Sequence, residues 1–224
     1  MSGTSAGSVE ALEVTVTAPV VSFRDPLYSG VQVTLPCPSP ATVGGLLAAA
    51  AGGWDQVDPG LAFAMAFHAR GRGTDLETYH PLDASGRKTD PAPRNRDFLA
   101  FATLRIWLFE DLELWRRRLR RPRWPLRLGR SQDLVGLALR TAAVREEPGA
   151  QRSAVVPDAA AAGTLLRLPT AVALDRAATR WGTYRFDATG RTAVPVPGSR
   201  STAEGQALVR LPSPHPDTVV RAPA

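Results

Sequence analysis

The alternation of apolar and polar residues along the chain predicts a series of strands. Residues 11–23 alternate in this way and are rich in β-branched side chains, which is typical of a half-buried strand. Residues 97–109, DFLAFATLRIWLF, give the strongest strand pattern in the chain. Similar patterns predict the remaining strands: residues 60–71, 134–146, 163–175 and 180–190.

Glycine, proline and short polar residues mark the expected interruptions. Arg-Gly-Arg-Gly at 70–73 predicts a turn directly after the strand at 60–71. Residues 79–96 are polar and proline-rich, which predicts a loop or an irregular hairpin. Residues 191–224 are rich in Pro, Ser and Thr, and we expect them to form a weakly ordered tail.

A first helix is predicted over residues 40–51. Ser39 is a candidate N-cap, proline follows at the first helical position, and two glycines at 52–53 supply the stop. Gly44 and Gly45 lie inside this helix, where each lowers helix propensity by about 1 kcal/mol relative to alanine. Their presence indicates that something approaches the helix backbone closely.

A second helix follows the strand at 97–109. Leu112, Trp115 and Leu119 recur at helical spacing, and Pro122 ends the run. This spacing buries one stripe and leaves the arginines of residues 116–121 around the rest of the helix.

The order strand, helix, strand, strand, helix, strand predicts an α+β fold of the ferredoxin-like, split βαβ type, as in RNA-recognition-motif domains. We expect a flexible N-terminus at 1–10 and the ferredoxin-like domain at 11–147. A smaller β-rich C-terminal portion at 148–224 would end in the proline-rich tail.

Charge is concentrated in one part of the chain. The formal net charge is +6, and 44% of the 224 residues are hydrophobic, enough for a real core. Residues 94–130 contain eleven arginines against four acidic residues, a local excess of seven. A nucleic-acid footprint gives this pattern, and so does a solvated helix face.

Several chemistries lack the residues that they need. Cys37 is the only cysteine, which excludes an internal disulfide and a cysteine-based zinc site. Three scattered histidines and no clustered carboxylates give no metal site, and no phosphate-binding Walker loop is present. The first residues lack a signal-peptide pattern, and no run of about 18 apolar residues occurs. We therefore expect a cytoplasmic protein with no membrane contact, no metal and no cofactor.

Two blocks of sequence, residues 22–52 and 94–136, resemble the Cas5 family, the CRISPR-associated RAMP-superfamily subunit of type I Cascade complexes. The first block carries Ser-Phe-Arg at 22–24 and then Pro-Ser-Pro-Ala-Thr-Val-Gly-Gly-Leu-Leu at 38–47. The second carries Leu-Gly-Arg-Ser at 128–131 after a helix and a proline-rich turn. Residues 22–26 and 128–131 resemble the I-B branch in particular.

The resemblance implies a ferredoxin-like RAMP domain with a protruding β-hairpin thumb. It also implies a role: a non-catalytic subunit that holds the 5′ handle of the CRISPR RNA (crRNA). Such subunits contact the large subunit and the first backbone subunit of Cascade. Target DNA is then read by base pairing and reaches this subunit only through the complex.

A splayed single-stranded handle needs guanidinium groups for phosphates, glycine where RNA meets the backbone, and aromatic faces for stacking. We expect Gly129 to admit the RNA backbone between two clamping arginines, and free amides at the start of the first helix to face a phosphate. The candidate RNA-binding residues are Ser22, Arg24, Tyr28, Ser39, Thr42, Val43, Gly44, Gly45, Arg127, Gly129, Arg130 and Ser131. For Arg127 and Arg130, the alternative is a surface salt bridge with Asp133 or Asp111.

Other interpretations remain open. One branch of the family is a metal-independent endoribonuclease, which would need a general acid and base; the candidates here are His68, Tyr79, His80 and Lys88. The absence of an adjacent Lys-His pair disfavours that branch. A free-standing RNA chaperone is a weaker alternative, because only 7% of residues are aromatic. The tryptophans at 107, 115 and 124 are expected to be core or interface anchors rather than stacking platforms.

Overall fold

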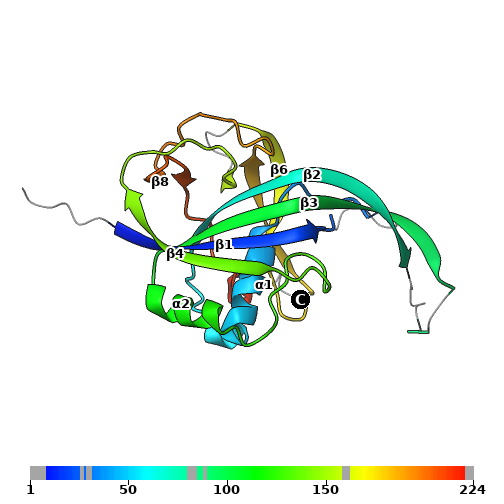
Figure 1. Cartoon of the computed structure of the whole chain (residues 1–224). Helices are drawn as coiled ribbons and strands as arrows, with labels where there is room; N and C mark the ends of the chain where they lie inside the picture. The colour runs from blue at the N-terminus through cyan, green and yellow to red at the C-terminus, as the bar shows by residue number, and fades with distance from the viewer. Residues whose placement is uncertain are drawn as a thin grey trace, which may run out of the picture.

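An antiparallel sheet forms the body of the molecule, and both α-helices lie on one of its faces (Figure 1). The computed structural model describes residues 9–25, 28, 32–79, 85–87, 90–157 and 162–219. The elements are β1 (Val9–Val21), α1 (Pro40–Ala51), η1 (Trp54–Gln56), β2 (Phe63–Tyr79), β3 (Ala92–Leu108), α2 (Leu112–Arg120), β4 (Gly136–Arg145), β5 (Val156–Pro157), β6 (Thr164–Val172), β7 (Thr179–Phe186), β8 (Arg200–Thr202), β9 (Ala207–Leu208) and η2 (Pro216–Thr218).

The sheet has the strand order β2-β3-β1-β4-β8-β9, and a second sheet has the order β5-β7-β6. From β1 to β4 the chain follows the predicted order of strands and helices, so the α+β class is confirmed. Residues 1–8 of the predicted flexible N-terminus lie outside the described residues, but β1 already begins at Val9. None of the helices in the described ranges is long and apolar enough to cross a membrane.

β1 lies inside the sheet, between β3 and β4, and its side chains point alternately to the two faces. Leu12, Val14 and Val16 are fully buried against the helical layer. On one side Leu12 pairs with Leu108 of β3, and on the other with Thr141 of β4. The predicted period-2 pattern of residues 11–23 is therefore confirmed, with the strand ending at Val21.

The second helix buries the apolar face that the sequence predicts. In α2, Trp115 and Leu119 are buried and Leu112 is partly buried, all in the main core cluster. Trp107 of β3 is fully buried and donates its indole N–H to Glu13 at 3.0 Å. The expectation that Trp107 and Trp115 anchor the core is confirmed.

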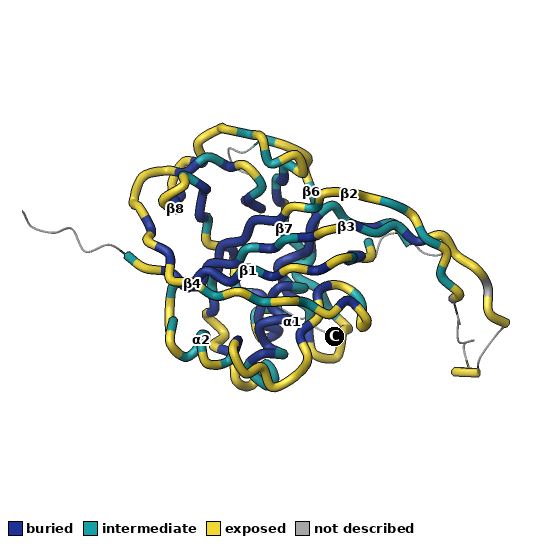
Figure 2. Tube along the Cα trace, viewed as in Figure 1, coloured by how far each residue is buried: buried dark blue, intermediate teal, exposed yellow. Residues whose placement is uncertain are grey.

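β2 and β3 continue far beyond the body as a two-stranded arm, defined here as residues 70–79 and 92–101 (Figure 1). The turn predicted at 70–73 is wrong, because the ladder runs on to the pair Tyr79 and Ala92. The segment 79–96, predicted as a loop or an irregular hairpin, contributes Tyr79 to β2 and residues 92–96 to β3, while residues 80–84, 88 and 89 lie outside the described residues. Gly73 continues the strand because the Phe98 ring occupies its side-chain position: a Cβ there would lie 2.6 Å from that ring. Figure 2 shows buried residues giving way to exposed ones along the arm.

The predicted weak order of residues 191–224 is wrong as far as Val219; residues 220–224 lie outside the described residues. β8 pairs with the end of β4, and Leu211 donates its backbone N–H to the Phe63 carbonyl at 2.9 Å. Pro214 and His215 are buried. Tertiary packing, which local composition does not report, orders this proline-rich segment. Strands β8 and β9 of the C-terminal portion therefore belong to the sheet of the predicted 11–147 domain, whereas β5, β6 and β7 form the second sheet.

Candidate nucleic-acid interface

The start of α1 is held by its own cap. Ser39 is buried, and its Oγ accepts the Thr42 N–H at 3.2 Å and lies 3.0 Å from the Thr42 hydroxyl. Val43 is fully buried, and its N–H donates to the Ser39 carbonyl at 3.2 Å. The side chains of Ser39 and Val43 therefore serve the fold, and only Thr42 of these three is partly exposed.

The two glycines of α1 have different surroundings. A Cβ at Gly44 would lie 2.6 Å from the Pro214 side chain and 2.9 Å from the Trp54 ring. The close approach predicted at Gly44 is thus made by the protein's own C-terminal segment. A Cβ at Gly45 would meet nothing within 4 Å, so this glycine leaves the helix surface open to a ligand.

The Leu-Gly-Arg-Ser sequence forms a closed turn beside α1. Leu126 and Leu128 are buried, and the Leu128 N–H donates to the Asp133 carbonyl at 3.0 Å. Because alternate residues point inward, Arg127 between the two leucines is exposed. It forms no ion pair with an acidic residue in the part of the chain that the structure describes. Ser131 is exposed at the tip of the turn.

Arg130 is committed to a neighbour. Its Nη2 lies 2.8 Å from Asp133 Oδ1 and its Nε 2.9 Å from Oδ2, while the Arg130 backbone N–H also donates to Oδ2 at 3.1 Å. The Asp133 side chain is only 3% exposed and that of Arg130 19%. The salt-bridge alternative is therefore confirmed for Arg130, which leaves Arg127 as the exposed guanidinium of the predicted clamp.

Gly129 is required by the chain itself. Its φ of +98° favours glycine, and a Cβ there would lie 2.6 Å from the Ser22 carbonyl oxygen. The Ser22 backbone therefore already accounts for a glycine at this position, and the predicted admission of RNA stays a prediction. This contact joins the turn to the end of β1.

Ser22 is buried, and its hydroxyl donates to the Asp97 carbonyl at 2.7 Å, which ties the end of β1 to the base of the arm. The Arg72 guanidinium, together with the Thr74 hydroxyl, holds the pKa of the Asp97 carboxyl below its ordinary value. Arg24 is exposed in the segment that follows β1, and Tyr28 is 52% exposed farther along it.

A groove runs along the open side of α1. Thr42 and Gly45 of the helix line it, opposite Trp124, Arg127 and Gly129. The Trp124 backbone N–H donates to the Ala49 carbonyl at 3.2 Å, which fixes this residue beside the helix end while its side chain remains 56% exposed. Of the two roles predicted for Trp124, core anchor or interface anchor, the core role is therefore wrong and the interface role stays a prediction. Its position beside Gly45 and Arg127 was not predicted.

A second exposed aromatic residue lies at the base of the arm. Phe101 is 63% exposed and has a φ of +50°, which is rare for a bulky side chain. The Arg70 guanidinium lies 5.8 Å from the centre of its ring, and both residues line a shallow pocket with Leu134, just after the turn. Only the alternating pattern around Phe101 was visible in the sequence, and it did not show which side chain would turn outward.

The candidate acid and base residues of the nuclease alternative do not form a described cluster. His68 is exposed on β2, opposite Thr103. The Tyr79 side chain, His80 and Lys88 lie outside the described residues. His215, predicted in a weakly ordered tail, is buried, and its Nε2 lies 3.0 Å from the Trp54 carbonyl. Within the described ranges, no group of three or more His, Cys, Asp or Glu side chains could hold a metal ion.

The structure thus divides the twelve predicted residues. Ser22, Ser39, Val43 and Gly44 are buried in the protein's own packing, and Arg130 is paired with Asp133. The remaining residues are exposed or partly exposed: Arg24, Tyr28, Thr42, Gly45, Arg127, Gly129 and Ser131. Thr42, Gly45, Arg127 and Gly129 meet in one groove, and Trp124 adds an aromatic face.

Comparison with known proteins gives one family. The model of the family described as CRISPR-associated protein (Cas_Cas5) matches residues 11–207. A solved structure described as "CRISPR RNA-guided surveillance complex" has a TM-score of 0.54 and 18% identity, covering 95% of this chain and 94% of that chain. A "Crystal structure of a CRISPR protein from Archaeoglobus fulgidus" has a TM-score of 0.49 and 12% identity, covering 89% of this chain and 99% of that chain. No curated protein matches the chain.

Proposed function

The chain belongs to the CRISPR-associated Cas5 family, and from this premise we propose that it is a non-catalytic subunit of a type I Cascade complex that binds the 5′ handle of crRNA. In this proposal the complex is of subtype I-B and acts in the cytoplasm in antiviral defence. The subunit bridges the large subunit and the backbone subunits. Target DNA reaches it only indirectly, through the complex. The body is a ferredoxin-like RAMP domain, and the β2–β3 arm is its thumb.

The groove along α1 is the observation that carries this proposal. It combines an exposed indole at Trp124, an exposed guanidinium at Arg127 and an open helix surface at Gly45. These groups suit a base face, a phosphate and a closely approaching sugar-phosphate backbone. No acidic residue is among those that line the groove, so no negative charge there repels an anionic strand.

The described histidines support the non-catalytic part of the proposal. A metal-independent nuclease places a general base and acid within hydrogen-bond reach of one phosphate. His215 is buried under the C-terminal segment, and His68 is exposed on the sheet opposite a threonine. Neither lines the groove that carries Arg127 and Trp124.

The test is to incubate the full chain with labelled repeat RNA, without added metal, and to follow retention and cleavage on gels. We expect binding without cleavage and a large loss of binding when the 5′ handle is removed. Site-specific cleavage would instead establish the nuclease alternative. Equal binding of RNA without a handle would remove the handle-binding role.

Variants locate the contact. Arg127→Ala should weaken binding and reduce the slope of log K against log salt by about 0.7, as one lost single-strand phosphate contact does. Arg145→Ala is the matched control, because Arg145 is exposed on β4 and does not line the groove. Equal salt slopes for both variants would exclude the groove as the binding surface.

A further inference from the structure

One edge of β4 is not paired with another described strand over most of its length. On one side it pairs with β1 from Gly136 to Val144, but on the other β8 pairs only with Val144 and Arg145. Within the described residues, no strand covers 136–143 on that side. Proteins usually guard such an edge with proline or with free charges. This stretch, GLALRTAA, has no proline, and its one charged residue, Arg140, is paired with the buried Glu13 at 2.8 Å.

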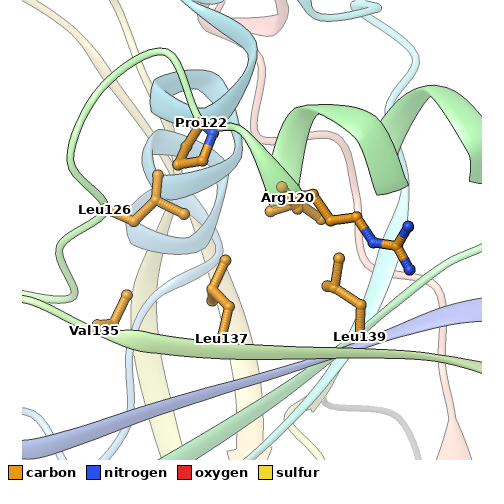
Figure 3. A pocket seen from close by; sticks show the side chains of 7 residues that line it. Arg120, Pro122, Leu126, Val135, Leu137 and Leu139 are labelled. Carbon is orange, nitrogen blue, oxygen red and sulfur yellow. The ribbon is translucent and has the colours of Figure 1, made fainter.

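An apolar groove follows this edge. Leu137 and Leu139 are partly exposed on the helical side of β4 and form its floor. Pro122 and Leu126 of the loop after α2 face them (Figure 3), and Leu119 near the end of α2 also lines the groove. The groove and the free strand edge therefore lie side by side, as binding of an extended peptide requires.

The rim of the groove is basic. Arg120 lines it. Arg117 of α2 and Arg121, which directly follows the helix, are exposed and form no ion pair with a described residue. Glu113, the one acidic residue of α2, is paired with Arg116 at 3.0 Å, and Arg116 also donates to Thr141 of β4 at 2.7 Å. A second copy of this chain on the same edge would bring two arginine-rich helices together. The charge therefore favours a different, acidic partner.

We propose that the free edge of β4 binds one extended acidic segment of another protein. The segment adds a strand beside residues 136–143 and places alternate apolar side chains over Leu137 and Leu139. Its acidic side chains lie against Arg117, Arg120 and Arg121. This surface is distinct from the groove that carries Trp124 and Arg127, so protein and RNA occupy different sites.

The probe is a short peptide of alternating glutamate and aliphatic residues, ELEVEVELE, acetylated and labelled, with KLKVKVKLK as its charge-reversed control. Binding to the full chain is followed by fluorescence anisotropy, and hydrogen exchange identifies the protected amides. We expect the acidic peptide to bind and to protect amides within 136–143. Absence of binding, equal binding of the basic peptide, or protection elsewhere would overturn the proposal.

The double variant Arg117→Glu/Arg120→Glu keeps the apolar groove and should weaken peptide binding by about tenfold. The matched control is Arg94→Glu/Arg145→Glu, which changes the net charge equally but away from the groove. A second experiment adds repeat RNA instead of the peptide. The RNA should leave the rate of amide hydrogen exchange at residues 136–143 unchanged. Protection of this edge by RNA would overturn the proposal, whereas loss of RNA binding with retained peptide binding would overturn only the proposed function.

Discussion

Gly44 and Gly45 are neighbours in α1, yet a methyl group at each would have very different effects. Pro214 and Trp54 fill the space beside Gly44, whereas the space beside Gly45 is empty. Gly44 is therefore needed for packing within the protein, whereas Gly45 only leaves the helix surface beside Trp124 without a side chain. Local sequence does not distinguish them, because Pro214 is far away along the chain.

Gly44→Ala should lower the free energy of unfolding by about 1–3 kcal/mol, since Pro214 or Trp54 must shift. Gly45→Ala should raise it by about 1 kcal/mol, through helix propensity alone. Chemical denaturation measures the free energy of unfolding of each variant. Equal effects would contradict the packing of the C-terminal segment on α1.

Arg130→Ala leaves the buried Asp133 carboxylate without its guanidinium, and should cost about 2 kcal/mol of stability. Arg127→Ala removes an exposed side chain and should change stability by less than about 0.5 kcal/mol. Adding Asp133→Asn to Arg130→Ala removes the unpaired charge and should restore part of the loss. An unchanged melting temperature for Arg130→Ala would show that the pair does not stabilise the turn.

These residues show how far the sequence predicts the site. Arg127, Gly45 and Thr42 were identified by residue type and motif, and they do line one groove. The pairing of Arg130 with Asp133 was one of two alternatives that the sequence left open. The contact of Gly129 with Ser22 was not predictable, because it depends on a distant segment reaching the turn from a particular direction. The position of Trp124 was not predicted, because it depends on the hydrogen bond from its backbone N–H to the distant Ala49 carbonyl.

At the scale of elements, the arm is held together by charge rather than by a hydrophobic core. Arg96 is buried and donates to Asp75 at 2.8 Å and forms an ion pair with Glu77, both across the hairpin. Arg72 and Asp97 form a further ion pair at 2.7 Å nearer the body. Sequence periodicity predicted both strands but ended the first at the glycines of 70–73 and began the second only at Asp97, because the cross-strand partners that extend them appear only once the register is known.

Arg96→Met should loosen the outer arm while leaving the body folded. It removes the shared partner of two carboxylates, which then repel each other on one strand. Hydrogen exchange should become faster at residues 74–79 and 92–97 and stay unchanged in β1. Arg94→Met is the control, because Arg94 is exposed on the same strand. Equal exchange in both variants would refute the role of Arg96.

At the scale of the whole molecule, the C-terminal portion completes the structure begun by the first half of the chain. β8 extends the sheet beyond β4, and Leu211 bonds to Phe63 at the start of β2. Composition suggested a loose tail because it counts prolines and does not register the buried positions between them. Leu211, Pro214 and His215 are buried although no helix or strand contains them, because contacts with distant parts of the chain cover them.

Leu211→Ala should lower the free energy of unfolding by about 3 kcal/mol, since this side chain is buried in the main core cluster. Leu174→Ala is the matched control, because Leu174 is 69% exposed in the turn after β6. Thermal unfolding of both variants measures the difference. A small effect at Leu211 would mean that the C-terminal segment is not part of the cooperative unit.

The same segment sets an order of events during synthesis. The ribosome releases α1 and β2 early, but Pro214 covers α1 and Leu211 joins β2 only after residues 211–216 have emerged. Until then the nascent chain exposes apolar surface that the mature body hides. Completion of the body therefore coincides with release of nearly all the described chain, and the groove along α1 that we propose for RNA is fully supported only at that late stage.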